Sequence, residues 1–113
     1  MAEGTKIDLI LASSSSRRID LLSQIGITPA LIVPPNIDET VQSNEKPREY
    51  VQRMSMAKAS ASKSSGKFLL AADTIVACGA RILPKAESYD TASSCLSFLS
   101  GRRHRVLGGV CLL

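Results

Sequence analysis

Four serines followed by two arginines stand in the stretch LILASSSSRR, from Leu9 to Arg18. They follow an apolar run and precede a segment with helical periodicity, which predicts a turn between a strand and a helix N-terminus. Unpaired N–H groups at such a turn bind anions, and serine hydroxyls add donors. Arg17 and Arg18 have the wrong charge for a helix N-terminus unless an anion or an acidic group lies nearby, and guanidinium groups suit phosphate. The residues therefore indicate a phosphate site, or alternatively a surface arginine pair after a serine-rich turn.

An aspartate interrupts the apolar run LLAADTIVA, from Leu69 to Ala77. Burying Asp73 in ionised form without a partner would be costly. One interpretation is a carboxylate held beside a strand to bind a metal ion or to take a proton from water. The other is a strand that ends at Ala72, with Asp73 and Thr74 in a solvated bulge.

Four more charged groups lack a local structural reason: Lys58, the pair Asp38–Glu39, Lys85, and the run RRHR from Arg102 to Arg105. Lys58 lies on or beside the apolar stripe of its predicted helix, so it points into a cleft or extends to solvent. The run RRHR binds phosphate or nucleic acid, or forms a solvated loop. Basic groups for phosphates and carboxylates for a divalent cation together suit hydrolysis of a nucleotide anhydride.

The composition narrows the class of protein. The chain has 113 residues, enough for one small domain at 1–113, and a net charge of +4 that suits an anionic ligand. No apolar run is long enough for a membrane span and the N-terminus lacks signal-peptide features, so we expect a soluble, cytoplasmic protein. The spacing of Cys78, Cys95 and Cys111 matches no zinc or redox motif, which predicts reduced, mostly buried thiols. A single histidine, His104, excludes a multi-histidine metal site.

Strand-like and helix-like segments alternate along the chain, which predicts an α/β protein. A serine at 15 or 16 would cap the first helix, Ile19, Leu22 and Ile25 would form its buried stripe, and Gly26 would end it. The expected strands are 7–11, 30–33, 68–78, 81–83 and 105–113; the expected helices follow the serines and span 47–62 and 89–99; loops are expected at 36–46 and 63–67. The last apolar run reaches the final residue, so we expect either a fold that is incomplete at its C-terminus or a partner segment, and we expect an exposed sheet edge to favour a homodimer or aggregation.

Six pieces of the sequence, in one order, resemble the Maf family of nucleoside triphosphate pyrophosphatases. They are LILASSSSRR, NIDE, MAKA, AADT, ILPKA, and LSGRRHRV followed by GGV. The resemblance implies a mixed twisted sheet with flanking helices around a nucleotide cleft. It also implies hydrolysis of a nucleoside triphosphate to a monophosphate and pyrophosphate, with a divalent cation such as Mg²⁺ or Mn²⁺.

The positions that match the family's motifs carry its site roles over to individual residues. The resemblance implies that Ser13, Ser15, Arg17, Arg18 and Thr74 bind the substrate or its phosphates. It implies that Glu39 and Asp73 are catalytic carboxylates, which would also hold the metal. It implies that Lys58 and Lys85 are catalytic lysines, which would hold and neutralise the phosphates. Asp73 would accept the proton of the attacking water.

Arg17, after the serines, and Thr74, after the strand aspartate, resemble the branch of the family that prefers dTTP and UTP as substrates. A modified nucleotide is the alternative substrate. Ser16 replaces the usual proline, PKA replaces GKP, and GGV replaces TGV. Family members also continue well beyond residue 113. Alternatives to the enzyme are therefore a nucleotide-binding fragment without catalysis and a septum-formation inhibitor that acts by binding partners. Nucleic-acid binding is not expected, because aromatic stacking platforms are missing.

Overall fold

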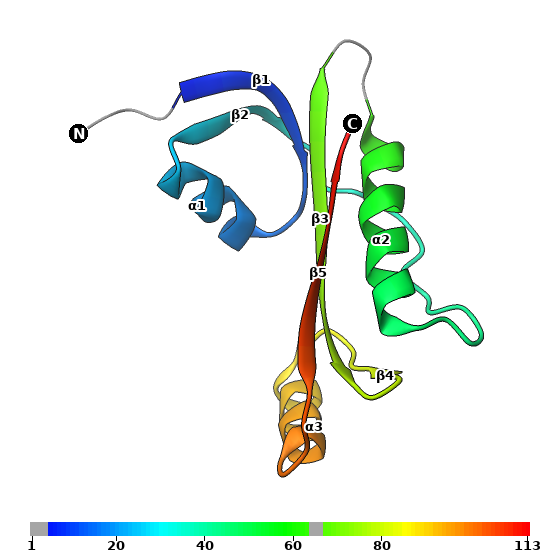
Figure 1. The fold of residues 1–113 in the computed structure, drawn as a ribbon. Helices are drawn as coiled ribbons and strands as arrows, with labels where there is room; N and C mark the ends of the chain where they lie inside the picture. The colour runs from blue at the N-terminus through cyan, green and yellow to red at the C-terminus, as the bar shows by residue number, and fades with distance from the viewer. Residues whose placement is uncertain (1–4, 64–66) are drawn as a thin grey trace.

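The computed structural model describes residues 5–63 and 67–113 and has a mixed α/β fold (Figure 1). In chain order its elements are β1 (Thr5–Ala12), α1 (Ser16–Gln24), β2 (Ile27–Ile32), α2 (Pro47–Ser62), β3 (Phe68–Cys78), β4 (Arg81–Ile82), α3 (Tyr89–Leu99) and β5 (Arg105–Leu112). The sheet has the order β2-β1-β3-β4, and β5 pairs with β3. β1 is parallel to β2 and β3, whereas β4 and β5 are antiparallel to β3. The α/β class and the mixed sheet with flanking helices are confirmed.

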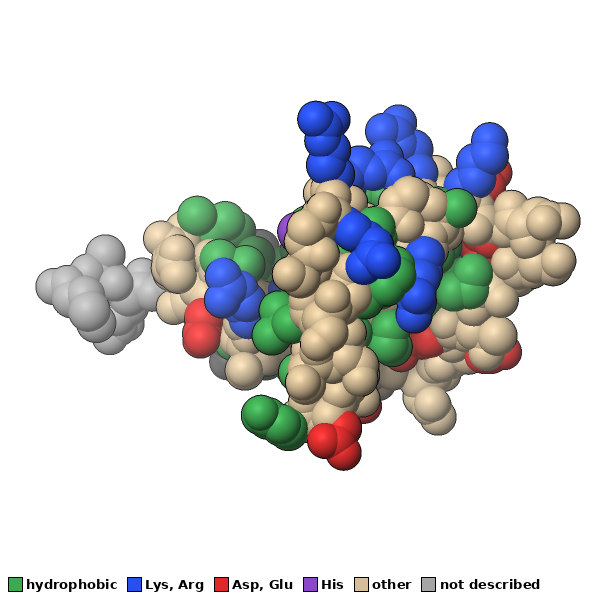
Figure 2. All heavy atoms as spheres, turned by 90° about the horizontal axis from the view of Figure 1, so that it is seen from below, with side chains coloured by type: hydrophobic (Ala, Val, Ile, Leu, Met, Phe, Trp, Pro, Cys, Tyr) green, Lys and Arg blue, Asp and Glu red, His purple; other side chains and the backbone are tan. Residues whose placement is uncertain are grey.

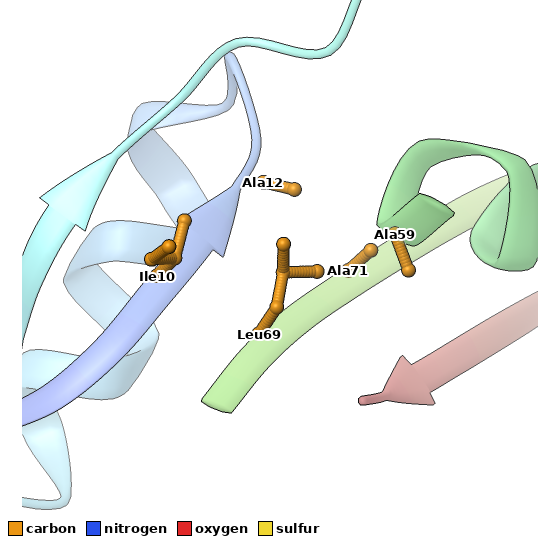
Figure 3. Packing of buried hydrophobic residues seen from close by; sticks show 5 residues of the cluster. All are labelled: Ile10, Ala12, Ala59, Leu69 and Ala71. Atoms are coloured by element: carbon orange, nitrogen blue, oxygen red, sulfur yellow. The ribbon is translucent and has the colours of Figure 1, made fainter. Parts of the chain in front are cut away.

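Strands β3 and β5 form a long ribbon through the middle of the molecule, and α2 lies along one side of it (Figure 1). Alternate residues of β3 face α2 because side chains alternate along a strand. Figure 3 shows this packing, where Ala59 of α2 lies over Leu69 and Ala71 of β3, next to Ile10 and Ala12 of β1. A second buried cluster, formed by Tyr50, Val51, Met54 and Ile75, continues the contact toward the start of α2. The core therefore fixes α2 on β3 along most of its length.

The backbone of β5 approaches α2 closely at one glycine. Gly109 is buried, and a Cβ atom added there would lie 2.6 Å from the backbone oxygen of Val51. Since a side chain at this point would force the helix away from the sheet, the glycine sets how near the two elements come.

The edge strand β2 begins earlier than predicted, at Ile27 instead of Ala30. It includes Pro29, which is paired in register with Ile7 of β1. A proline has no N–H to donate, so it fits the sheet only because β2 is an edge strand. The prolines at 34 and 35 do follow the strand end, as predicted.

The apolar side of α1 is less buried than the sequence pattern predicts. No residue of α1 is fully buried, and Ile25 at its end is 70% exposed. The reason is that α1 packs mainly against β2, on the opposite side of the β3–β5 ribbon from α2 (Figure 1). Helix α3 likewise buries none of its residues fully.

Some smaller predictions can also be compared with the structure. Gly26 follows α1 with a φ of +78°, as a residue that ends a helix often does. The three cysteines are free thiols, and each is half-buried, whereas none is fully buried. The predicted loop at 63–67 falls largely on residues 64–66, outside the described residues. In the part of the chain that the structure describes, no helix has the length and apolar character that crossing a membrane requires.

Candidate functional site

Asp73 lies in the middle of β3 and points to the face that α2 covers. Strand β3 continues on both sides of it, and Asp73 is paired in register with Gly109 of β5. The residue is 2% exposed. The alternative in which the strand ends at Ala72 and Asp73 sits in a solvated bulge is therefore wrong.

Lys58 supplies the partner that this buried carboxylate needs. Its Nζ atom donates to Asp73 Oδ1 over 2.6 Å, and its side chain is 7% exposed. Helix α2 carries Lys58 next to Ala59, on the side that packs against the sheet. The lysine thus points inward and does not extend to solvent.

Glu39 and Lys85 form a second ion pair beside the first. Lys85 Nζ donates to Glu39 Oε1 over 3.0 Å, and Lys58 Nζ lies 3.5 Å from the same oxygen. Burial raises the pKa of Glu39, but the hydrogen bond from Lys85 and the charge of Lys58 outweigh burial and hold the pKa below its usual value. Burial conversely lowers the pKa of Lys85, but the hydrogen bond to Glu39 and nearby negative charge leave it raised. Two carboxylates and two lysines thus alternate in one chain of contacts.

The serine turn lies between β1 and α1, next to this cluster. Ser13 is buried, and its Oγ accepts a hydrogen bond from the backbone N–H of Ser15. Ser15 is the N-cap residue of α1, but its side chain makes no capping hydrogen bond, which corrects the prediction of a side-chain cap. The turn is instead closed by Ser13, and among the described residues no side chain accepts from the first N–H groups of α1.

Of the two arginines after the serines, Arg18 reaches the sheet. Its Nη2 atom donates to Thr74 Oγ1 over 3.3 Å, which joins the serine turn to the residue after Asp73. Arg17 is exposed, and its side chain has no hydrogen bond or ion pair within residues 5–63 and 67–113. Neither guanidinium has an acidic partner among these residues, so their charge is available to an anion.

Two hollows adjoin the cluster. The polar hollow has a volume of about 240 Å³ and is lined by the serine turn together with Arg18, Lys58 and Lys85. The open cleft is larger, about 650 Å³, and combines Asp73, Glu39 and Lys85 with mostly apolar groups such as Ile75, Leu83 and Leu99. Lys85 lines both. The arrangement can hold an anionic group in the first hollow while an apolar or ring-shaped group lies in the second.

Two residues that the sequence patterns did not single out hold the loop that carries Glu39. Tyr50 Oη donates to the backbone oxygen of Glu39 over 2.6 Å. Arg53 donates to the backbone oxygen of Thr40 and to both carboxylate oxygens of Glu45. The spacing of Glu45, Glu49 and Arg53 by four residues was a signal, but it favours a Glu49–Arg53 pair. Instead, the carboxylate of Glu49 accepts a hydrogen bond from the backbone N–H of Lys46, at the start of α2.

The donor set suits a hard divalent cation only in part. Within the described ranges no three of His, Cys, Asp and Glu come together as metal ligands. Two carboxylates, Asp73 and Glu39, do converge on Lys58. Mg²⁺ is commonly held by one or two carboxylates together with substrate phosphates and water, and this pair fits that mode.

The basic run RRHR lies away from this cluster. Figure 2 shows the end of the molecule that carries α3, with several Lys and Arg side chains gathered along one side of it. The run lines a separate hollow with Ala77 and Gly79, and the guanidinium groups of Arg81 and Arg102 lie over the ring of Phe98. The structure thus brings the other predicted site residues around Lys58 and the serine turn, except that Arg17 is exposed and lines neither hollow, and it does not bring these arginines there.

Comparison with known proteins gives consistent matches. A family model described as Maf-like protein matches residues 8–113. The dTTP/UTP pyrophosphatase of Paramagnetospirillum magneticum is 56% identical over 107 residues, which cover 93% of this chain and 56% of that protein. The dTTP/UTP pyrophosphatase of a Wolbachia strain from Drosophila simulans is 53% identical over 115 residues, covering 100% of this chain and 58% of that protein.

A solved structure, a nucleoside-triphosphatase / dITP/XTP pyrophosphatase from Mycobacterium abscessus, superposes with a TM-score of 0.46 at 13% identity and covers 96% of this chain and 73% of that one. The chain spans a little over half the length of the curated relatives it matches. Because the family model extends over nearly the whole chain and the relatives are more than half identical to it, the chain belongs to the Maf-like protein family.

Proposed function

We propose that this chain carries the catalytic and phosphate-binding groups of a nucleoside triphosphate pyrophosphatase. The observation that supports this most is the cluster of two carboxylates and two lysines beside a polar hollow, centred on the 2.6 Å contact between Lys58 and Asp73. The relatives that match are named dTTP/UTP pyrophosphatases, which favours dTTP and UTP as substrates.

In this proposal the triphosphate enters the polar hollow. Ser13, Ser15 and the free N–H groups of α1 receive phosphate oxygens, and Arg17 and Arg18 supply the positive charge that those oxygens require. The lysines bind the phosphates from the other side. The open cleft receives the sugar and the base, because its lining is largely apolar.

Hydrolysis then needs a base and a neutralised leaving group. The oxygen of a water molecule attacks the α-phosphorus, the bond from this phosphorus to the bridging oxygen breaks, and pyrophosphate leaves. Asp73 takes the proton of the water. Glu39 and Asp73 would hold a divalent cation, which supplies charge neutralisation at the phosphates.

The ion pairs explain how ligand binding and catalysis are connected. Without ligand, Lys58 and Lys85 each bind a carboxylate, so Asp73 and Glu39 are occupied. Phosphates compete for both lysines and thereby free the carboxylates for the water and the cation. We therefore expect Mn²⁺ to bind weakly to the chain alone and more tightly with a non-hydrolysable α,β-methylene analogue of dTTP.

The test is to measure the products formed from dTTP, UTP and the other common triphosphates with Mg²⁺ or Mn²⁺. We expect the reaction to release one pyrophosphate for each nucleoside monophosphate and no free phosphate. Asp73→Asn should abolish turnover, whereas Asp90→Asn, at an exposed aspartate of α3, should leave it unchanged. A folded chain that binds triphosphate without turnover would contradict the proposal of a hydrolase, and one that binds none would contradict the site as well.

A further inference from the structure

The segment that carries Glu39 has no regular secondary structure. We call residues 36–46 the carboxylate loop; it joins β2 to α2. The side chain of Glu39 is 42% exposed, and its carboxylate contacts Lys85 and Lys58. With this much of the side chain exposed, its position depends on what holds the backbone of the loop.

Arg53, in the second turn of α2, makes the strongest contact with the carboxylate loop. Its Nε and Nη2 atoms lie 2.6 and 2.8 Å from the two carboxylate oxygens of Glu45, a two-pronged geometry. Nη2 also donates to the backbone oxygen of Thr40 over 2.9 Å. The hydrogen bond from Arg53 lowers the pKa of Glu45 to about 2, so this pair is charged at neutral pH.

Tyr50 holds the neighbouring carbonyl group. Its hydroxyl donates to the backbone oxygen of Glu39 over 2.6 Å, and its ring is buried with Met54 and Ile75. The guanidinium of Arg53 lies 5.5 Å from the centre of this ring. Two side chains of one rigid helix thus bind two consecutive carbonyl groups, those of Glu39 and Thr40.

We propose that Tyr50 and Arg53 are positioning residues that fix the carboxylate of Glu39 between Lys85 and Lys58. The inference rests on the proposed function, because positioning has a purpose only if Glu39 takes part in binding or catalysis. The carbonyl groups of Glu39 and Thr40 belong to two successive planar peptide units, and fixing both carbonyl groups fixes both planes. The Cα atom of Glu39 lies in the first of these planes, so this limits the directions in which the Glu39 side chain can leave the backbone. The same helix carries Lys58, so α2 places both the carboxylate and one of its partners.

The two contacts can be removed without disturbing the helix itself. Tyr50→Phe deletes one hydroxyl and keeps the buried ring, and Arg53→Met keeps most of the aliphatic length while deleting every donor. Arg48→Met is the matched control, since Arg48 is an exposed arginine of the same helix without a hydrogen bond or ion pair in the described residues. Backbone ¹⁵N order parameters of residues 38–41 report the loop directly and need no turnover.

We expect these order parameters to fall from about 0.85 to below about 0.6 in Tyr50→Phe and Arg53→Met, and to stay unchanged in Arg48→Met. Unchanged order in the first two variants overturns the inference, whether or not the chain hydrolyses dTTP. If the loop loosens but the wild-type chain is inactive, the proposed function fails and the contacts are structural only.

A kinetic comparison separates positioning from a general structural role. Loss of an outer partner of a metal-binding group typically costs about 10- to 100-fold in activity or metal affinity, so we expect kcat to fall by about tenfold in Arg53→Met with little change in KM. In a Glu39→Gln background the same substitution should change kcat by less than about twofold, because the group that Arg53 positions is already lost. An equal loss in both backgrounds overturns the inference.

Discussion

The ion pair between Lys58 and Asp73 should contribute to stability as well as to chemistry. In Lys58→Met the side chain keeps most of its length, but the buried carboxylate of Asp73 is left without a basic partner in the part of the chain that the structure describes. At 2.6 Å and an effective dielectric constant of about 20, the attraction is about 6 kcal/mol before the cost of desolvation is subtracted. Removing one partner of such buried pairs typically costs about 3–5 kcal/mol, and we expect Lys58→Met to lose this amount.

Asp73→Asn should cost less, about 2–3 kcal/mol, although it breaks the same contact. The reason is that Lys58 keeps a second partner, Glu39 Oε1, at 3.5 Å, whereas Asp73 has no second basic partner among the described residues. Solvent exposure of Glu39 makes this second contact weaker than the first.

Urea unfolding followed by circular dichroism measures these differences, and the double variant Lys58→Met/Asp73→Asn completes the cycle. With both charges removed, the double variant should be more stable than Lys58→Met alone. A loss below about 1 kcal/mol in Lys58→Met, or a double variant as unstable as the sum of the single variants, would falsify the description of this contact as a buried, coupled pair.

Three further changes test other contacts. Gly109→Ala should lower the free energy of unfolding by about 1–3 kcal/mol, because the added Cβ would lie 2.6 Å from a backbone oxygen of α2. Gly108→Ala is the control, since a Cβ added at Gly108 would have no such close neighbour among the described residues. Equal losses in the two variants would contradict the close approach. The pKa of Glu45 is lowered from 4.5 to about 2 in the folded chain, so its contribution to stability is present above pH 4.5 and is lost as the pH falls toward 2. In Glu45→Gln the free energy of unfolding should therefore fall less steeply as the pH is lowered from 4.5 to about 2. An unchanged slope would count against the ion pair. Ser88→Ala should cost about 1 kcal/mol because its side chain caps α3, whereas Ser15→Ala should cost much less because it makes no capping bond; thermal melting that reverses this order would refute the assignment.

Local signals in the sequence were sufficient for the elements around the site. The bounds of α2, β3 and α3 agree with the predictions because each has a clear start or stop, such as Pro47 at the first position of α2 and Gly79 after β3. The pattern around Lys58 correctly placed it beside the apolar stripe. Periodicity could not show that its neighbour would be Asp73, because that contact depends on how α2 crosses the sheet.

Other features depend on tertiary packing and were missed or mispredicted. The apolar stripe of α1 has a helical period, but burial requires a facing surface, and α1 packs mainly against the edge strand β2. The expected side-chain cap at Ser15 is not made, and the hydroxyl of Ser13 instead accepts from the backbone N–H of Ser15, a local bond of the kind that serine side chains form in turns. The contacts of Tyr50 and Arg53 with the loop join residues 8 to 13 positions apart through an irregular segment, for which no simple spacing rule exists.

The close approach at Gly109 affects how this protein can tolerate mutation. Where a helix and a sheet are separated by interlocking side chains, substitutions on either surface move the two elements apart or together. Here the close approach of main-chain atoms limits the separation at one point, at Gly109, the residue paired with Asp73 in the sheet. Substitutions among the side chains of the surrounding core can thus accumulate without changing the distance between α2 and β3 that Lys58 spans to reach Asp73. The glycine itself has almost no permitted replacement.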